Sequence, residues 1–311
     1  MIQANGLTKR YGEKLAVDDV SFTVRPGIVT GFLGPNGAGK STTMRLIVGL
    51  DRQTSGSVTV NGKDYRQSPA PLREVGALLE AKAVHSSRSA YNHLRVLAAT
   101  HGISSQRVMT VLDLVGLADV GRKRAGAFSL GMGQRLGIAS ALLGDPGVLI
   151  LDEPINGLDP EGIRWVRELL TSLAAEGRTV FVSSHLMSEM ALTADHVIVV
   201  GRGRVIADVP MQQLIAGASS GVVRVQTPGA AQLAKALARD GVTVSQDGSE
   251  VLDVTGLSAG QIGQVALDER IVLHGLAAQE ASLEEAFMEM TRDSLDFHAH
   301  LQDETPQETA V

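Results

Sequence analysis

The sequence predicts an α/β fold built on a central, mostly parallel sheet and followed by a smaller α+β domain. Short, solidly apolar runs are typical of strands buried on both faces of a parallel sheet, and they occur at 148–151, 179–182 and 196–200. Between the first two runs lies a helical pattern with Asp159 as N-cap and Pro160 at its first position. Strands that alternate with helices indicate an α/β domain with its ligand at the carboxyl ends of the strands.

The elements on either side of this pattern are of two kinds. Residues 1–33 are rich in β-forming segments, with turn signals at Asn5-Gly6, at Arg25-Pro26-Gly27 and, further on, at Asn61-Gly62. Apolar residues at helical spacing then dominate about 85–145. The sequence therefore predicts a β-rich beginning and a helical insertion in the middle of the α/β domain.

A complete G-x-x-x-x-G-K-[ST] phosphate-binding loop joins a predicted strand over 28–33 to a predicted helix over 41–50. The motif consists of Gly34, Pro35, Asn36, Gly37, Ala38, Gly39, Lys40, Ser41 and Thr42. The glycines let backbone N–H groups surround phosphate oxygens, and the helix start attracts negative charge. We expect Lys40 to reach the β- and γ-phosphates and Ser41 to help hold Mg²⁺. The alternative is a glycine-rich turn without a ligand, but the strand-loop-helix context favours a nucleotide-binding protein.

Two carboxylates, Asp152 and Glu153, close the apolar run at 148–151. We expect Asp152 to hold Mg²⁺ and Glu153 to be the general base that activates water for attack on the γ-phosphate. The alternative is an acidic surface turn, but carboxylates at the end of a buried strand are costly unless a cation meets them. His185 follows the next strand, so it is expected at the same edge of the sheet, beside the phosphates.

The order of motifs resembles the ATP-binding subunit of an ABC transporter over residues 1 to about 215: phosphate loop, helical insertion, signature segment, Asp-Glu strand end, Gly-Leu-Asp loop and histidine. The resemblance implies an antiparallel β subdomain, a helical subdomain and a head-to-tail homodimer around two MgATP molecules. It implies adenine stacking for Tyr11, which could instead be a packing residue, and a γ-phosphate contact for His185. Ser129 and Gly131 would cap the γ-phosphate held by the partner chain.

Two departures from the common family pattern narrow the resemblance. The signature usually reads Leu-Ser-Gly-Gly-Gln, whereas residues 128–132 read Phe-Ser-Leu-Gly-Met. Glu80 stands where the family usually has a glutamine that contacts Mg²⁺ and senses the transporter; a carboxylate can also ligate Mg²⁺, and the alternative is a solvated loop residue. Both features resemble the bacitracin- and daunorubicin-type exporter ATPases, which pair one such chain with a separate six-helix membrane subunit.

This resemblance implies an ATPase at the cytoplasmic face of the membrane, attached through a permease subunit and driving export of drugs or antibiotics. The alternative is a soluble ABC-type ATPase in macromolecular or cofactor assembly. The sequence has no apolar run near the roughly 18 residues that span a bilayer, so membrane association is expected to go through the partner. It contains no cysteine, and its net charge of −6 argues against direct nucleic-acid binding.

The last third of the chain predicts an accessory domain without a chemical site. A linker is expected at 216–221 and the small domain at 222–292, ending in a helix whose core face includes Phe287. A capping-box pattern opens that helix at Ser282. Residues 293–311 carry five acidic residues and no Lys or Arg, so an acidic, disordered tail is expected.

Overall fold

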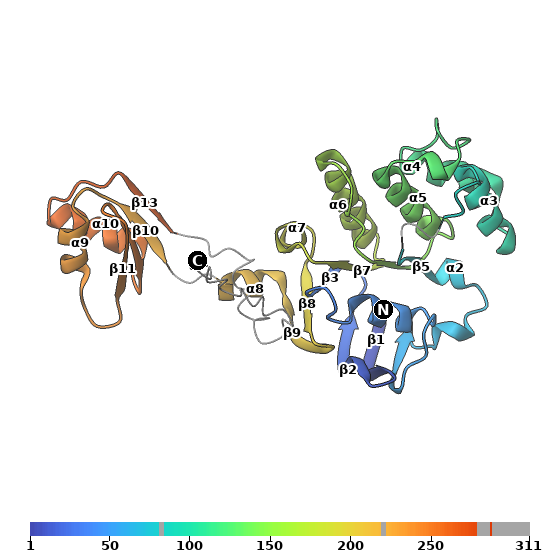
Figure 1. Cartoon of the computed structure of the whole chain (residues 1–311), viewed down its shortest axis with the longest axis horizontal. Helices are drawn as coiled ribbons and strands as arrows, with labels where there is room; N and C mark the ends of the chain where they lie inside the picture. The colour runs from blue at the N-terminus through green and yellow to red at the C-terminus, as the bar shows by residue number, and fades with distance from the viewer. Residues whose placement is uncertain (81–83, 219–221, 279–286, 288–311) are drawn as a thin grey trace, which may run out of the picture.

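The computed structural model describes residues 1–80, 84–218, 222–278 and 287 (Figure 1). These residues form a central sheet, an N-terminal antiparallel sheet, a helical group and a separate C-terminal sheet with its own helices. Within the described part of the chain, no helix is both long and apolar enough to cross a bilayer.

The central sheet has the mostly parallel order that the sequence predicts. Its strands, in spatial order, are β5 (Val75–Leu78), β6 (Val148–Leu151), β7 (Thr179–Ser184), β3 (Val29–Leu33), β8 (His196–Gly201) and β9 (Arg204–Pro210). Only the β8–β9 pairing is antiparallel among these described strands. Every residue of β3, β6 and β7 is buried, as expected for strands covered on both faces.

The N-terminal sheet is antiparallel and has the order β2 (Lys14–Val24), β1 (Ile2–Tyr11), β4 (Ser55–Val60). The turn predicted at Asn5-Gly6 is wrong: both residues lie inside β1, where the pairing with β2 shifts register between Ala4 and Leu7. A β-bulge, like a tight turn, can need a residue in the left-handed conformation, and Gly6 provides it with φ of 57°. The turns predicted at Pro26-Gly27 and Asn61-Gly62 are confirmed.

Three phenylalanines join the N-terminal sheet to the central one. The rings of Phe22 on β2, Phe32 on β3 and Phe181 on β7 lie with centroids 5.0 to 5.7 Å apart. Aromatic pairs at this spacing add to the stability that burial alone provides. This contact fixes the N-terminal sheet beneath the strand that leads into the phosphate loop.

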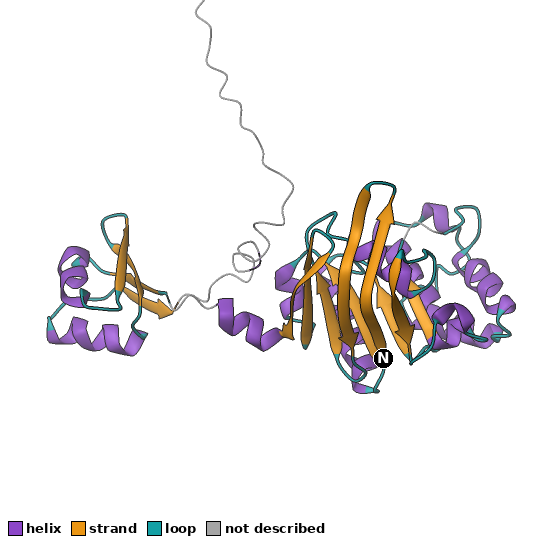
Figure 2. Cartoon of the chain, turned by 90° about the horizontal axis from the view of Figure 1, so that it is seen from below, coloured by secondary structure: helices purple, strands orange, loops and turns teal. Residues whose placement is uncertain are grey.

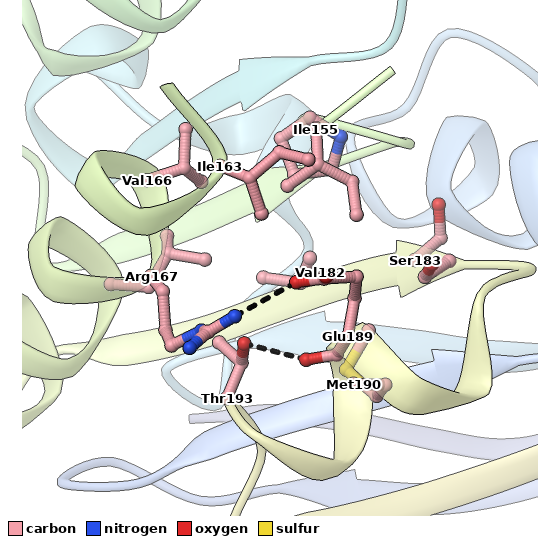
Figure 3. Close-up of a pocket in the computed structure, with 12 residues that line it drawn as sticks. Ile155, Ile163, Val166, Arg167, Val182, Ser183, Glu189, Met190 and Thr193 are labelled. Atoms are coloured by element: carbon pink, nitrogen blue, oxygen red, sulfur yellow. Dashed lines mark hydrogen bonds and ion pairs between the residues drawn. The ribbon is translucent and has the colours of Figure 1, made fainter. Parts of the chain in front are cut away.

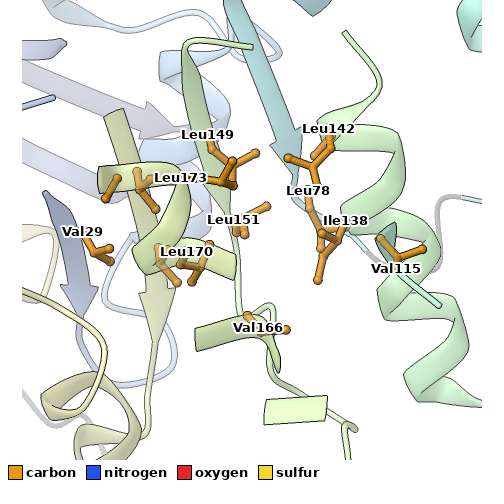
Figure 4. Close-up of a cluster of buried hydrophobic side chains, with 14 of the residues drawn as sticks. Val29, Leu78, Val115, Ile138, Leu142, Leu149, Leu151, Val166, Leu170 and Leu173 are labelled. Carbon is orange, nitrogen blue, oxygen red and sulfur yellow. The ribbon is translucent and has the colours of Figure 1, made fainter. Parts of the chain in front are cut away.

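The helices cover the central sheet and form the predicted insertion. They are α1 (Lys40–Ile47), α2 (Pro71–Glu74), α3 (Ala90–Thr100), α4 (Ser105–Leu114), α5 (Leu130–Leu142), α6 (Pro160–Ala175), α7 (Met187–Ala191) and α8 (Met211–Ala218), with short 3₁₀ turns at Tyr65–Gln67 and Ala125–Ala127. Figure 1 shows α3, α4 and α5 grouped beyond the β5 edge of the sheet. One apolar core links this group to the sheet: Leu78 of β5 contacts the α5 side, and Leu170 and Leu173 of α6 cover the neighbouring strands (Figure 4).

The C-terminal part has a ferredoxin-like β-α-β-β-α-β order, which confirms the α+β class. Its elements are β10 (Val223–Gln226), α9 (Ala230–Leu237), β11 (Thr243–Asp247), β12 (Val251–Thr255), α10 (Ala259–Asp268) and β13 (Gly275–Ala278), in the sheet order β11-β12-β10-β13. Figure 2 shows both helices on one face of this sheet. They enclose a core of their own that includes Leu233, Leu252 and Ile262.

The boundaries drawn at this end of the chain stay predictions. Residues 216–218, expected in the linker, form the last turn of α8, and 219–221 lie outside the described residues. Phe287 is buried, which agrees with a core position, but it belongs to the large core that includes Met211 and Leu214 and not to the core of the small domain, where the sequence placed it. The rest of the predicted final helix and the 293–311 tail lie outside the described residues.

Candidate nucleotide site

The phosphate loop forms a tight turn between β3 and α1. Gly37 and Gly39 both adopt left-handed backbone conformations, with φ of 84° and 99°. A Cβ at Gly39 would lie 2.5 Å from the carbonyl oxygen of Ala16, so only glycine fits there. Gly39 is the N-cap of α1 and provides no side-chain cap. The first N–H groups of the helix are therefore available to an anion such as a phosphate.

Lys40 is a buried cation at the first position of α1. Its side chain is 7% exposed and its Nζ donates to the carbonyl of Gly34 at 2.6 Å. The same nitrogen lies 3.7 Å from Oε1 of Glu153. Burial lowers the pKa of Lys40, while the carboxylates of Glu153 and Asp152 act in the opposite direction. A buried ammonium group between a carbonyl and two carboxylates is suited to meeting phosphate charge.

Glu153 has an unusual backbone that two buried side chains hold in place. Its φ is 50°, a left-handed conformation that is strained for a residue with a Cβ. Its N–H donates to Oγ of Ser183 at 2.9 Å, and its carbonyl accepts from Nε2 of Gln134 at 3.0 Å. The Ser183 hydroxyl in turn donates to Oδ1 of Asp152. Strain of this kind is found where a side chain must be aimed at a site.

His185 completes a cluster around the Glu153 carboxylate. Its Nδ1 lies 2.8 Å from Oε2 of Glu153, and its ring is 42% exposed. The structure thus brings Lys40, Glu153 and His185 together at the carboxyl ends of β3, β6 and β7, and joins Asp152 to them through Ser183. The positions agree with the sequence prediction; the chemical roles stay predictions.

Tyr11 lies beside the start of α1 and keeps much of its ring exposed. Its hydroxyl donates to Oδ2 of Asp51 at 2.8 Å, and Arg45 of α1 donates to the same oxygen at 2.7 Å. The Lys9 ammonium is 4.6 Å from the ring centroid. The ring is 44% exposed, and its hydroxyl interacts with the Thr42 side chain at the end of the phosphate loop. An exposed, anchored ring next to the loop is a suitable stacking surface.

Ser129 and Gly131 begin α5, as predicted. Ser129 is the N-cap, and its exposed hydroxyl accepts from the N–H of Met132 at 3.3 Å. A Cβ at Gly131 would stand 3.2 Å from the carbonyl oxygen of Gly157, so this segment packs on the loop after β6. The exposed hydroxyl lies at the start of α5, and a helix start is a position that attracts anions.

Glu80 follows β5 and lies at the same edge of the sheet as Asp152, whose N–H donates to the carbonyl of Leu78 at 2.7 Å. Its side chain is exposed and lines a groove with Arg45, Leu50 and Val84. Leu50 is 60% exposed there. Among the described residues, no group of three or more acidic, His or Cys side chains could hold a metal by itself.

A narrow, mostly apolar cavity lies between α6 and α7, next to Pro154 and Ser183 (Figure 3). Ile163, Val182 and Met190 contribute apolar walls, and Arg167 of α6 donates to Glu189 of α7 at 2.9 Å. This ion pair joins the helix that follows the Asp159 loop to the helix that follows His185. The ion pair therefore holds together two helices that pack beside the site.

The sequence alone did not identify Ser183 and Gln134 as site residues. Ser183 is fully buried within the apolar strand β7, and Gln134 is 3% exposed on α5. The sequence did contain one indication of these two residues. Each is a polar residue within an apolar strand or helix face, and such a residue needs a hydrogen-bond partner when it is buried. The β3-loop-α1 turn, the β6 carboxylates and the β7 histidine together define a P-loop ATPase site.

The comparisons with known proteins specify the family. Residues 17–156 match the ABC transporter family, and residues 221–284 match a domain of unknown function. The lantibiotic transport ATP-binding protein SrtF of Streptococcus pyogenes is 39% identical over 67% of this chain and 90% of its own. The bacitracin transport ATP-binding protein BcrA of Bacillus licheniformis is 42% identical over 69% of this chain and 71% of its own.

Two further matches extend the comparison. The daunorubicin resistance ATP-binding protein DrrA3 of Streptomyces coeruleorubidus is 34% identical over 94% of this chain and 96% of its own. A solved ATP-binding subunit of an ABC transporter is 27% identical, with a TM-score of 0.64 over 70% of this chain and 92% of its own. The chain belongs to the ABC transporter ATP-binding proteins and is an ATPase.

Proposed function

We propose that this ATPase is the nucleotide-hydrolysing subunit of a drug or antibiotic exporter, acting as a head-to-tail homodimer on a separate membrane permease. The observation that carries the hydrolytic part is the Glu153 carboxylate, which lies 3.7 Å from Lys40 and 2.8 Å from His185 at the end of β6. The export part is supported by relatives named for lantibiotic transport, bacitracin transport and daunorubicin resistance.

The residues of the cluster have distinct roles in this proposal. The amides of Gly34–Thr42 and the Lys40 ammonium hold the phosphates of ATP. The oxygens of Ser41 and Asp152 hold Mg²⁺, with Glu80 as a further candidate, since Mg²⁺ typically takes one or two carboxylates together with substrate phosphates. When bound, Mg²⁺ neutralises charge on the phosphates.

Glu153 accepts the proton of the attacking water as general base. His185 contacts the Glu153 carboxylate through Nδ1 at 2.8 Å, and in this proposal the N–H of its other ring nitrogen donates to the γ-phosphate. The exposed ring of Tyr11 stacks on adenine. Ser129 and Gly131, at the exposed start of α5, cap the γ-phosphate held by the second chain of the dimer.

The permease is proposed to dock on the groove beside Glu80. Leu50, 60% exposed, and Val84 supply apolar surface there, whereas Arg45 and Glu80 supply charges of both signs. A cytoplasmic segment of a membrane protein fits a surface of this mixed kind. In this proposal the docked permease holds the ATPase at the cytoplasmic face of the membrane.

Replacement of Glu153 tests the hydrolytic assignment. Glu153→Gln keeps the size of the side chain but removes the base, so ATP turnover should fall by about 10²- to 10⁴-fold. ATP binding should remain, and gel filtration with ATP should show a persistent dimer. Glu168→Gln is the matched control, because that carboxylate is 72% exposed on α6 and its ion pair among the described residues is a distant one, with Arg164 at 3.9 Å. Near-normal hydrolysis by Glu153→Gln would show that another group is the base.

Purification from native membranes tests the partner. The Glu153→Gln protein is extracted in mild detergent with ATP, and the associated proteins are identified. A stoichiometric protein with several membrane spans supports the exporter assignment and supplies the subunit for a cargo assay. Soluble partners alone would favour the alternative role in macromolecular or cofactor assembly.

A further inference from the structure

We propose that Gln134 is a positioning residue that links the signature helix α5 to the Glu153 carboxylate of the same chain. The inference rests on the proposed function, because it takes Glu153 as the general base. It adds a residue that makes no contact with ATP and acts through the Glu153 main chain.

The first observation is that Gln134 is a buried polar residue at a position where an apolar side chain could fill the same space. Gln134 is 3% exposed, on a helix whose neighbouring buried positions are Leu136, Ile138 and Ala139. Its Nε2 donates to the carbonyl of Glu153 at 3.0 Å. A buried amide without a partner is unfavourable, so this hydrogen bond accounts for the presence of glutamine.

The second observation is that the Glu153 backbone needs support on both sides. Its φ of 50° is a strained conformation that surrounding contacts must maintain. Ser183 of β7 holds the N–H at 2.9 Å, and Gln134 of α5 holds the carbonyl at 3.0 Å. Rotation of the backbone would break one of these two bonds. The direction of the carboxylate toward Lys40 and His185 therefore depends on both supports.

The consequence is a connection between the two ATP sites of the dimer. Ser129 starts α5 and is proposed to cap the ATP held by the partner chain, whereas Gln134 follows on the second turn of the same helix. Residues this close on a helix are separated by about 7.5 Å along its axis and move together. When Ser129 contacts the partner's nucleotide and α5 moves, Gln134 thus transmits this movement to Glu153, the general base of the chain that contains α5.

Two substitutions separate positioning from packing. Gln134→Met keeps the length and the burial of the side chain but has no donor, and Gln134→Ala removes both. We expect both variants to lower kcat by about three- to tenfold, the effect of one hydrogen bond, with the KM for ATP within about twofold of wild type. Thr110→Ala, which removes a helix-local hydrogen bond elsewhere in the helical group, should leave kcat unchanged.

The outcomes decide between the interpretations. Wild-type kcat in Gln134→Met would show that the side chain only fills space, and a raised KM with normal kcat would show that it acts on ATP binding; either result overturns the inference. If Gln134→Ala does not fold, the Met variant alone gives the answer. Glu153→Gln in the same assay separates the two proposals: if it abolishes turnover while Gln134→Met keeps the wild-type kcat, the base assignment stands and the link fails.

Discussion

Gly39→Ala tests whether the backbone of the phosphate loop has the geometry described above. The substitution places a Cβ at φ of 99°, 2.5 Å from the carbonyl oxygen of Ala16, which is main chain of β2 and cannot rotate away. A left-handed conformation at a residue with a Cβ costs about 1–3 kcal/mol. Forcing an atom into filled space costs about 1–3 kcal/mol more. The expected loss in the free energy of unfolding is therefore about 2–6 kcal/mol.

Gly37→Ala is the matched control for this loss. Gly37 is also left-handed, with φ of 84°, but a Cβ there would meet no atom within 4 Å. Only the conformational term applies, so Gly37→Ala should lower the free energy of unfolding by about 1–3 kcal/mol. The difference between the two variants measures the steric contact with Ala16 alone.

Urea unfolding without nucleotide measures both variants. Trp165 is the sole tryptophan of the sequence and lies on α6, so its fluorescence reports on the domain that contains the loop. Equal m-values would show that both variants unfold through the same transition. If Gly39→Ala proves no less stable than Gly37→Ala, the described approach of the loop to β2 is wrong.

Two other predictions concern the adenine surface and a peripheral ion pair. Tyr11→Ala should weaken ATP binding by about 5- to 150-fold in calorimetry, whereas Tyr11→Phe should bind nearly as wild type. Burial raises the pKa of Asp145, but Arg178 and Arg107 outweigh it and hold this pKa below the ordinary value of 3.8. The ion pairs therefore stabilise the fold above that pH and are lost as the pH falls through the lower, folded-state pKa. Asp145→Asn should lower the free energy of unfolding by less than about 1 kcal/mol at pH 7, and a difference that does not shrink as urea unfolding is repeated at successively lower pH below 3.8 would contradict this.

The parts of the fold that could be predicted are those whose signals are local. The apolar run 148–151 predicts a buried strand, and Asp159 followed by Pro160 predicts a helix start. Both predictions are independent of the rest of the chain, because these patterns act over a few residues. The site residues Lys40, Glu153 and His185 could be placed together for a related reason. Each follows a predicted parallel strand or loop at its carboxyl end, and those ends share one edge of the sheet.

The parts that could not be predicted depend on tertiary contacts. Asn5-Gly6 has turn chemistry, but a bulge uses the same left-handed glycine. β1 continues beyond it because its pairing resumes with β2 at Leu7 and with β4 at Thr8. Ser183 and Gln134 act on Glu153 from positions 30 and 19 residues away along the chain. No periodicity reveals such a pair of supports, because each is one polar residue among apolar neighbours.

The departure of the signature segment from the common pattern can be understood from the contacts at the start of α5. The Ser129 hydroxyl accepts from the main-chain N–H of Met132. The N-cap of α5 therefore does not need the glutamine side chain that the common pattern has at that position. Leu130, in place of a glycine, is 56% exposed and lies against Gly157, where a Cβ would approach its Cδ2 to 2.2 Å. The larger residue is thus accommodated by the loop after β6. The hydroxyl and helix start that the proposed cap requires remain in place, and the altered residues lie beside them.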